Sequence, residues 1–296
     1  MNKTRRLSRV LILLLPVILS IIGSAFAQTN SPVLEVPFNF DNNEIVVLAM
    51  INNEGPYRML LDTGSTVSYV DRGLAKKLAL KQGKKGNTAV GYDTREKVYP
   101  TKLSSVRLGP LEASDVEAFV YDMTVDQAEG FEKFEGVLGH GFLKNRIVEI
   151  DYPNRVIRFH TQMPFGSQDD LKFSFHDELV IDDVRINGHQ IDAEIDTGLD
   201  LAFQLLPRTI KALKLQYEHY GSVKLPVITL DSVTLGTLSL QSVGVLSLAN
   251  SNKAADREKS LPGFYIGNGF LKRYVMIVDY PNGVVILRSP PSMEKR

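Results

Sequence analysis

The tripeptide Asp-Thr-Gly occurs twice in this 296-residue chain, beginning at Asp62 and at Asp196, each time after a short segment that we interpret as a hydrophobic strand. A given tripeptide of this kind is expected on the order of 0.05 times in a chain of this length. Two carboxyl groups that share one site can work as a general base and a general acid, because one is ionised while the other keeps its proton. The alternative is that both tripeptides are turns retained by ancestry alone.

The two tripeptides belong to a series of blocks that recur in the same order. The blocks begin at residues 61, 106, 139 and 151 in the first half and at residues 195, 233, 267 and 279 in the second. This repetition predicts a duplicated unit of about 130 residues. The polar stretch 160–170, which contains Pro164 and Gly166, is typical of a linker. We therefore expect an N-terminal lobe over residues 28–165 and a C-terminal lobe over residues 166–296.

The elements around these blocks are expected to be short β-strands. Runs rich in β-branched or aromatic residues, separated by turn residues, occupy positions 46–48, 57–61, 106–108, 118–120 and 155–159. One helix is predicted in each half, over residues 72–80 after a capping Asp71 and over residues 207–215 beginning at Pro207. The sequence thus predicts two similar, mainly β lobes, each supplying one aspartate.

These motifs resemble those of the aspartic proteases. A later hydrophobic-hydrophobic-glycine element follows each Asp-Thr-Gly, at residues 137–139 and 265–267. The runs LLDTGSTVSYVDRGLAKKLAL, GVLGHGFLKN and VEIDYPNRVIRF are similar to the bacterial, retropepsin-like branch of that family. The resemblance covers nearly all of residues 28–296, counted as two fused units. It implies a mainly β, bilobal retropepsin- or pepsin-like fold and an aspartic endopeptidase that hydrolyses an extended peptide or protein substrate with Asp62 and Asp196.

The chemistry of amide hydrolysis explains why two carboxyl groups are needed. The attacking water must lose a proton and the departing nitrogen must gain one. Two full charges about 3 Å apart at an effective dielectric constant of about 20 repel by roughly 5.5 kcal/mol. This repulsion corresponds to about four pKa units, so the pair keeps one proton over its working range. The reaction needs no cofactor and no metal.

The remaining residues of the tripeptides are expected to support the carboxylates. Gly64 and Gly198 let the backbone approach closely and offer N–H groups to the carboxylate oxygens. The family resemblance implies that the Thr63 and Thr197 hydroxyls interlock across the interface between the lobes.

The residue after each tripeptide differs between the halves. Ser65 offers a hydroxyl that we expect to donate to the outer oxygen of Asp62, whereas Leu199 offers Asp196 no donor. A donated hydrogen bond favours the ionised carboxylate. The sequence therefore predicts that the shared proton resides on Asp196.

A flap over the site is expected in the first half. The segment 87–100 is polar and has Gly91 and Tyr92 at its centre, as suits a hinge and an aromatic tip that closes over substrate. The alternative is an ordinary surface hairpin. The loop at the matching place in the second half is shorter.

Residues 1–27 are expected to be a secretory signal peptide. Four basic residues precede an apolar run over residues 10–22, and Ala25-Phe26-Ala27 matches a cleavage site. The run is too short to span a bilayer, which takes about 20 residues, so no stable membrane insertion is expected after cleavage. We expect a protein that is exported to the periplasm or secreted.

Composition excludes several other classes of function. The chain has no cysteine, so it has neither disulfides nor cysteine nucleophiles. Without the four basic residues of the leader, the chain has 30 Lys and Arg and 34 Asp and Glu, which gives a net charge of −4. This charge does not indicate the excess of basic residues that binding to nucleic acid requires. The five histidines lack metal-ligand spacing, and His140, whose counterpart is Asn268, suits a hydrogen bond within its loop.

Two other classes of protein remain open from the sequence. A non-catalytic peptide-binding protein on the same bilobal scaffold is the main alternative, because a fold does not imply an activity and Leu199 departs from a symmetric motif. A structural β protein of the cell envelope would not need two Asp-Thr-Gly copies. We expect a monomer, since the chain carries both halves of the site.

Overall fold

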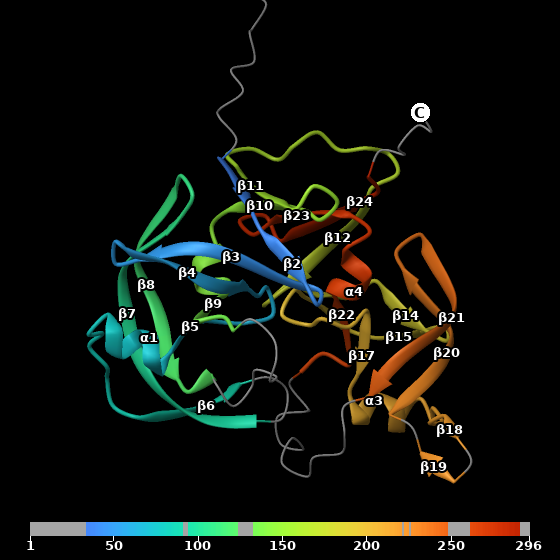
Figure 1. Cartoon of the computed structure of the whole chain (residues 1–296). Coiled ribbons are helices and arrows are strands. Elements are labelled where there is room, and N and C mark those ends of the chain that lie inside the picture. Colours follow the sequence, from blue (N-terminus) through green and yellow to red (C-terminus); the bar gives the residue numbers. More distant parts are fainter. Residues whose placement is uncertain are drawn as a thin grey trace, which may run out of the picture. The chain divides into compact units, whose positions relative to one another are not determined.

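The computed structural model describes residues 34–90, 94–123, 133–220, 222–224, 226–247 and 261–290. The predicted signal peptide (1–27) and the predicted flap residues Gly91 and Tyr92 lie outside these ranges. The described chain is mainly β, with two large sheets and four short helices, which confirms the predicted fold class (Figure 1).

Most strands of the first half form one eight-stranded sheet in the order β2-β3-β4-β9-β5-β8-β7-β6. Its strands are β2 (Asn39–Asp41), β3 (Glu44–Ile51), β4 (Glu54–Leu61), β5 (Ser68–Asp71), β6 (Gly86–Val90), β7 (Thr94–Leu108), β8 (Leu111–Tyr121) and β9 (Gly136–Leu138).

The other large sheet has fourteen strands in the order β1-β11-β10-β23-β24-β12-β13-β16-β22-β17-β21-β20-β14-β15. Three of them come from the first half, namely β1 (Leu34–Pro37), β10 (Ile147–Asp151) and β11 (Val156–His160). The others are β12 (Leu171–His176), β13 (Val180–Ile181), β14 (Val184–Ile186), β15 (His189–Gln190), β16 (Ala193–Asp196), β17 (Phe203–Leu205), β20 (Val227–Leu235), β21 (Leu238–Ser247), β22 (Phe264–Gly267), β23 (Val275–Asp279) and β24 (Val284–Arg288). A separate two-stranded sheet joins β18 (His219–Tyr220) to β19 (Val223–Lys224).

The strands that carry the two aspartates have the same neighbours in both halves. In the first half, β9 lies between β4 and β5, parallel to β4 and antiparallel to β5. In the second half, β22 lies between β16 and β17 with the same two directions. In each half the strand that leads into the aspartate runs parallel to the strand of the later glycine element, and the two strands end side by side. Leu61 pairs with Leu138 in the first half, and Asp196 pairs with Gly267 in the second. Each aspartate therefore stands at the carboxyl end of a parallel strand pair.

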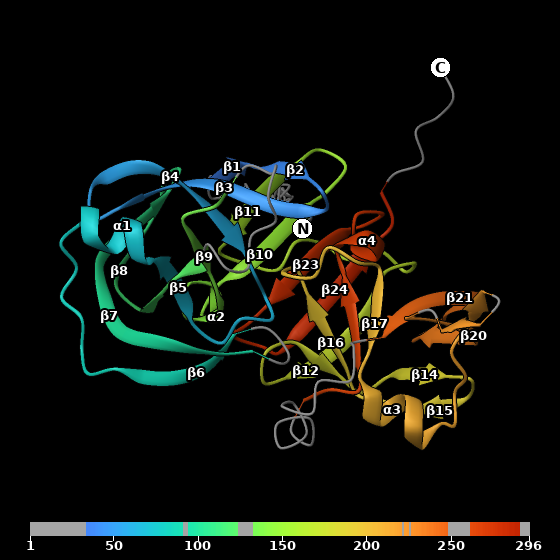
Figure 2. The same cartoon turned by 60° about the horizontal axis from the view of Figure 1, so that its bottom comes forward.

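Strands β10 and β23 join the two halves within one sheet. They pair antiparallel, with Ile147 opposite Asp279 and Asp151 opposite Val275. Outward from this pair, β11 and β1 follow on one side and β24 and β12 on the other. Figures 1 and 2 show these strands between the blue and green sheet of the first half and the yellow and orange strands of the second. The centre of the sheet is thus a continuous connection between the halves.

The two predicted helices are present but shorter than expected. Helix α1 covers Arg72–Lys77 and α3 covers Pro207–Ala212. Asp71 caps α1 by accepting a hydrogen bond from the Gly73 N–H at 2.7 Å. Each helix stops early because a following residue adopts positive φ, namely Ala79 at 49° and Lys214 at 53°. Two further short helices, α2 (His140–Leu143) and α4 (Asn268–Leu271), follow the later glycine elements.

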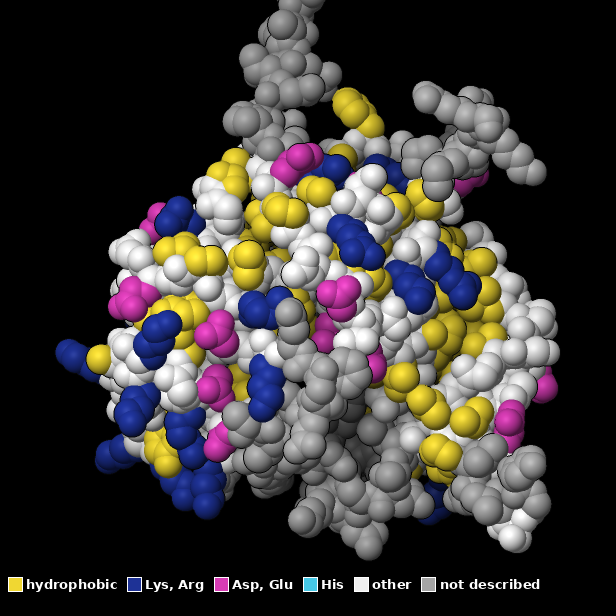
Figure 3. Space-filling view, viewed as in Figure 1, with side chains coloured by type: hydrophobic (Ala, Val, Ile, Leu, Met, Phe, Trp, Pro, Cys, Tyr) yellow, Lys and Arg dark blue, Asp and Glu magenta, His cyan; other side chains and the backbone are white. Residues whose placement is uncertain are grey.

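One large hydrophobic core runs through both halves, and its buried side chains come mainly from the alternating faces of the strands. Smaller clusters lie beside the two aspartate strands, and they differ in composition between the halves. The described surface carries both signs of charge, with exposed lysines around α1 at the lower left of Figure 3. Among the described helices, none has the length and hydrophobicity needed to cross a membrane.

Candidate active site

The two aspartates lie next to each other at the meeting point of the halves. Asp62 follows the last residue of β4, and its N–H donates to the Leu138 carbonyl at 3.0 Å. Asp196 is the last residue of β16. Their carboxyl groups share a hydrogen bond, so the structure brings together two side chains that are 134 positions apart in the sequence.

Each carboxylate is held by the glycine of its own loop and covered by the glycine of the other. The Gly64 N–H donates to Asp62 Oδ1 at 2.9 Å, and the Gly198 N–H donates to Asp196 Oδ1 at 2.7 Å. A Cβ added to Gly64 would lie 2.7 Å from Asp196 Cγ, and one added to Gly198 would lie 2.6 Å from Asp62 Cγ. Real Cβ atoms do not approach other heavy atoms so closely, so a side chain at either position would displace the opposite carboxylate.

The threonines of the two tripeptides form four hydrogen bonds across the interface. The Thr63 hydroxyl donates to the Ile195 carbonyl at 2.9 Å, and the Thr197 hydroxyl donates to the Leu61 carbonyl at 2.8 Å. Each hydroxyl also accepts the backbone N–H of the opposite threonine at 3.0 Å. Both side chains are buried, so these bonds fix one loop against the other without solvent.

Burial and a neighbouring carboxylate govern the electrostatics of the pair. The pKa of Asp62 is raised well above its ordinary value, first because the group is buried and then because of the charge and the hydrogen bond of Asp196. The backbone N–H groups of Gly64 and Ser65 oppose this shift by stabilising the ionised form. Two carboxyls in this arrangement hold a shared proton where isolated ones would both be ionised.

The hydrogen bond expected from the Ser65 hydroxyl to Asp62 is not observed, whereas Leu199 is apolar and buried as expected. The Ser65 hydroxyl donates to the Val67 carbonyl at 2.8 Å, which leaves only the Ser65 backbone N–H to act on Asp62. The Leu199 side chain packs in a cluster with Leu206. The prediction that a Ser65 hydroxyl bond would direct the proton to Asp196 is therefore wrong, because the hydroxyl satisfies its own loop instead.

The loops after the later glycines are anchored differently in the two halves. The Asn268 amide donates to the carbonyls of Thr197 and Asn43, each at 2.7 Å, and its Oδ1 accepts the Tyr152 hydroxyl at 2.7 Å. His140 takes the matching place in the first half, where its ring packs edge-on against Tyr280. Burial lowers the pKa of His140, so its ring favours the neutral form.

Reasoning from the sequence missed Glu194, which lies beside the pair of aspartates. Its Oε1 is 2.7 Å from the position that a Cβ on Gly64 would take. The short segment before the second tripeptide, residues 192–195, was interpreted as a hydrophobic strand, yet Glu194 stands in it where the first half has Leu60. Comparing the two copies position by position would have revealed this exchange of a leucine for a carboxylate.

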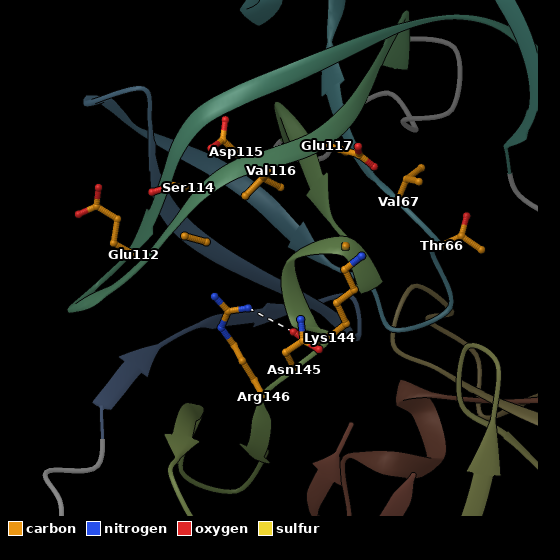
Figure 4. A pocket seen from close by; sticks show the side chains of 12 residues that line it. Thr66, Val67, Glu112, Ser114, Asp115, Val116, Glu117, Lys144, Asn145 and Arg146 are labelled. Atoms are coloured by element: carbon orange, nitrogen blue, oxygen red, sulfur yellow. Dashed lines mark hydrogen bonds between the residues drawn. The ribbon is translucent and has the colours of Figure 1, made fainter. Parts of the chain in front are cut away.

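A separate cavity of about 570 Å³ lies beside the loop that follows the first tripeptide. Figure 4 shows strand β8 above it and Lys144, Asn145 and Arg146 below it, with Thr66 and Val67 at one side. Its walls carry both signs of charge and include neither Asp62 nor Asp196. Among the described residues, no group of three or more histidine and carboxylate side chains is arranged to hold a metal ion.

Comparisons with known proteins agree with this geometry. Residues 47–145 match the model of the family described as "gag-polyprotein putative aspartyl protease". Among solved structures, the aspartic proteinase from Irpex lacteus matches with a TM-score of 0.56 and 14% identity over 89% of this chain and 99% of that one. No curated protein sequence matches the chain at a significant level. The resemblance to the retropepsin-like aspartyl proteases is thereby confirmed, and the family match and the fold support aspartic protease activity in general.

Proposed function

We propose that this chain is an aspartic endopeptidase in which Asp62 and Asp196 form one catalytic dyad. The observation that carries the proposal is the hydrogen-bonded pair of carboxyl groups, contributed by the two halves and covered by each other's glycines. Four interlocking threonine bonds support it, because they fix the position of both loops. Positions fixed in this way suit a reaction that depends on alignment.

The mechanism follows from the single proton that the dyad shares. The ionised carboxylate accepts a proton from water as the water oxygen bonds to the peptide carbonyl carbon, and the protonated carboxyl donates its proton toward the carbonyl oxygen. The tetrahedral intermediate then collapses: the ionised carboxylate takes a proton from one of the intermediate's two hydroxyls as the C=O bond re-forms, the C–N bond breaks, and the protonated carboxyl gives its proton to the departing nitrogen. The products are a carboxylic acid and an amine, and the dyad again holds one proton.

The proposal includes an extended peptide or protein substrate, a monomer as the active form, and export to the periplasm or the medium. A monomer follows from the presence of both carboxyls in one chain. Export rests on the basic, apolar and Ala25-Phe26-Ala27 order of residues 1–27. Edman sequencing of the protein from its host tests the leader: a mature chain that begins at Gln28 is expected, and one that begins at Met1 contradicts export.

Single and double asparagine substitutions test the dyad. Asp62→Asn and Asp196→Asn should each reduce kcat on an unbiased peptide library by about a thousandfold or more, because a carboxamide neither accepts nor donates the required proton. The double variant should be no slower than either single variant, since the two groups act as one unit.

Asp115→Asn is the matched control, because its carboxyl is 75% exposed and its ion pair within the described residues is with Lys102 on the surface. It should keep wild-type turnover. All four variants should unfold cooperatively, which separates lost chemistry from lost structure. A single variant that retains turnover refutes the shared dyad.

The main alternative, a peptide-binding protein without activity, gains no support from the geometry. It rested on Leu199, whose side chain is 7% exposed and packs beside Leu206. The dyad geometry around Asp196 matches that around Asp62 in its glycine bond and its threonine bonds.

A further inference from the structure

The two strands that carry the dyad differ in the residue that shares a face with the aspartate. Alternate residues of a strand point to the same side, so Leu60 stands beside Asp62 and Glu194 beside Asp196. Both side chains are buried to the same extent, each 7% exposed. The dyad is therefore flanked by two walls whose residues are equally buried: an apolar wall at Leu60 in the first half and a wall with a carboxyl group at Glu194 in the second half.

The cross-strand neighbours extend this contrast. In the first half, Leu60 pairs with Val137 and Val137 pairs with Tyr69, and all three belong to one hydrophobic cluster. In the second half the corresponding row is Glu194, Tyr265 and Gln204. Residues paired across neighbouring strands project from the same face of the sheet. The wall on the second half thus has a carboxyl (Glu194) and a carboxamide (Gln204) where the first half has Leu60 and Tyr69.

The Glu194 carboxyl reaches the dyad itself. Its Oε1 and Asp196 Oδ1 both lie 2.7 Å from one point, the position of a Cβ on Gly64, so no more than twice that distance separates the two oxygens. A substrate bond held at the dyad would therefore have Glu194 against one of its flanking side chains.

Within the described part of the chain, Glu194 has no hydrogen-bond or ion-pair partner. The charges that act on it are the carboxylates Asp196, Asp62 and Glu178, and no cation of the described chain is among them. Gln204 is 8% exposed, and its Oε1 has no partner in the described chain. A buried acceptor without a donor is costly, so this wall is built to receive donors from a ligand.

We propose that Glu194 and Gln204 form a specificity subsite that takes an arginine or lysine side chain next to the scissile bond, while the Leu60 wall takes an apolar side chain on the other side. The proposal rests on the proposed endopeptidase function. A guanidinium brings positive charge and five N–H donors, enough to reach a carboxylate and an amide oxygen on alternate strands of one sheet. An ammonium brings three donors to the same acceptors.

The subsite should respond to pH in a way that the dyad does not. The pKa of Glu194 is raised well above its ordinary value, first by burial and then by the charges of Asp196, Asp62 and Glu178. The strands on either side of Glu194 present Val180 and Tyr265, which add no positive charge. At low pH the subsite is neutral, and as pH rises the carboxylate forms and the preference for a cation strengthens.

The experiment compares two peptides that differ only in arginine or its uncharged near-isostere citrulline, placed in turn on each side of the cleaved bond. The ratio of their kcat/KM values cancels the titration of the dyad, which is common to both. In the wild type this ratio should exceed about tenfold at one position and rise with pH. Glu194→Gln should bring it near one and make it independent of pH, and Glu194→Leu should favour an apolar residue there, as Leu60 does.

Glu178→Gln is the matched control, because it removes a nearby charge without changing the residue that faces the dyad. It should keep the arginine preference. A ratio near one at every pH in the wild type, or a ratio that survives Glu194→Gln, overturns the subsite while leaving the endopeptidase proposal intact. If the wild type cleaves neither peptide, the endopeptidase proposal fails, and binding of the same pair by fluorescence anisotropy decides the subsite: equal affinities, or no binding, refute it.

Discussion

Replacing Thr197 by valine tests whether the interlocked threonines hold the two halves of the site in place. Valine keeps the shape of the side chain but removes the hydroxyl that accepts from the Thr63 N–H and donates to the Leu61 carbonyl. Thr63 and Thr197 are 1% and 0% exposed, so water does not replace the lost partner. Two buried backbone groups are left unsatisfied at about 1–3 kcal/mol each, which predicts a loss of about 2–6 kcal/mol in the free energy of unfolding.

Urea unfolding and turnover on one peptide measure the two consequences. The midpoint should fall without a change in slope, and the midpoint temperature should fall by about 2–4 °C for each kcal/mol lost. Turnover should fall by about a hundredfold, because a displacement of about 1 Å at the dyad is that costly. Thr63→Val should behave alike, and the double variant should lose less stability than the sum of the single variants, since each substitution already loosens the shared loop contact.

Thr209→Val is the matched control for this prediction. Thr209 is also buried, and its hydroxyl donates to the Gly263 carbonyl at 2.9 Å within the second half. Its loss should reduce stability by about 1–3 kcal/mol and leave kcat unchanged. If Thr197→Val keeps wild-type kcat, or is no less stable than the wild type, the threonines do not position the dyad and the reasoning is wrong.

Three further outcomes follow from the site. The kcat/KM profile should be bell-shaped, and its alkaline limb should lie well above the usual range of a carboxyl because the pKa of Asp62 is raised; a limb at the ordinary carboxyl pKa contradicts the buried pair. The pKa of Glu194 is also raised on folding, so its contribution to stability is complete below the ordinary value of 4.5 and is lost as pH rises through the folded-state pKa. Urea midpoints should therefore fall from acid toward neutral pH, and less steeply in Glu194→Gln; parallel curves exclude this assignment. Gly198→Ala should abolish turnover because its methyl group would lie 2.6 Å from Asp62 Cγ, whereas Gly244→Ala, with open space around it, should not; equal turnover of both variants argues against the close approach.

The sequence was sufficient to predict the fold class and to indicate where the two aspartates would meet. The fold class was predicted from local strand patterns, and the meeting of the aspartates from two tripeptides in equivalent places together with the resemblance to the aspartic proteases. The sequence also predicted the helix cap at Asp71 and the helix start at Pro207, because each of these residues acts on its nearest neighbours in the chain.

The predictions that failed depended on contacts that a linear pattern does not contain. The helices end at residues with positive φ, Ala79 and Lys214, where no glycine marks the end. From the sequence, the Ser65 hydroxyl could donate to Asp62 or to a carbonyl of its own loop, and the folded conformation of the loop selects the Val67 carbonyl. Glu194 was treated as part of an apolar strand, because its burial depends on partners that are far away in the sequence.

The register of β10 against β23 favours association of the two different halves over association of two copies of the same half. The pairing places Glu149 opposite Ile277 at the midpoint of the two strands. Two copies of the first half, joined in the same register, would set Glu149 and its Arg158 partner, 2.6 Å away, against a second such ion pair, and burying two ion pairs at the joint is less favourable than packing an isoleucine there. The carboxylate in one strand and the isoleucine in the other thus give the joint a preference for unlike partners, so a chain cut between β11 and β12 should reassemble from its two different pieces.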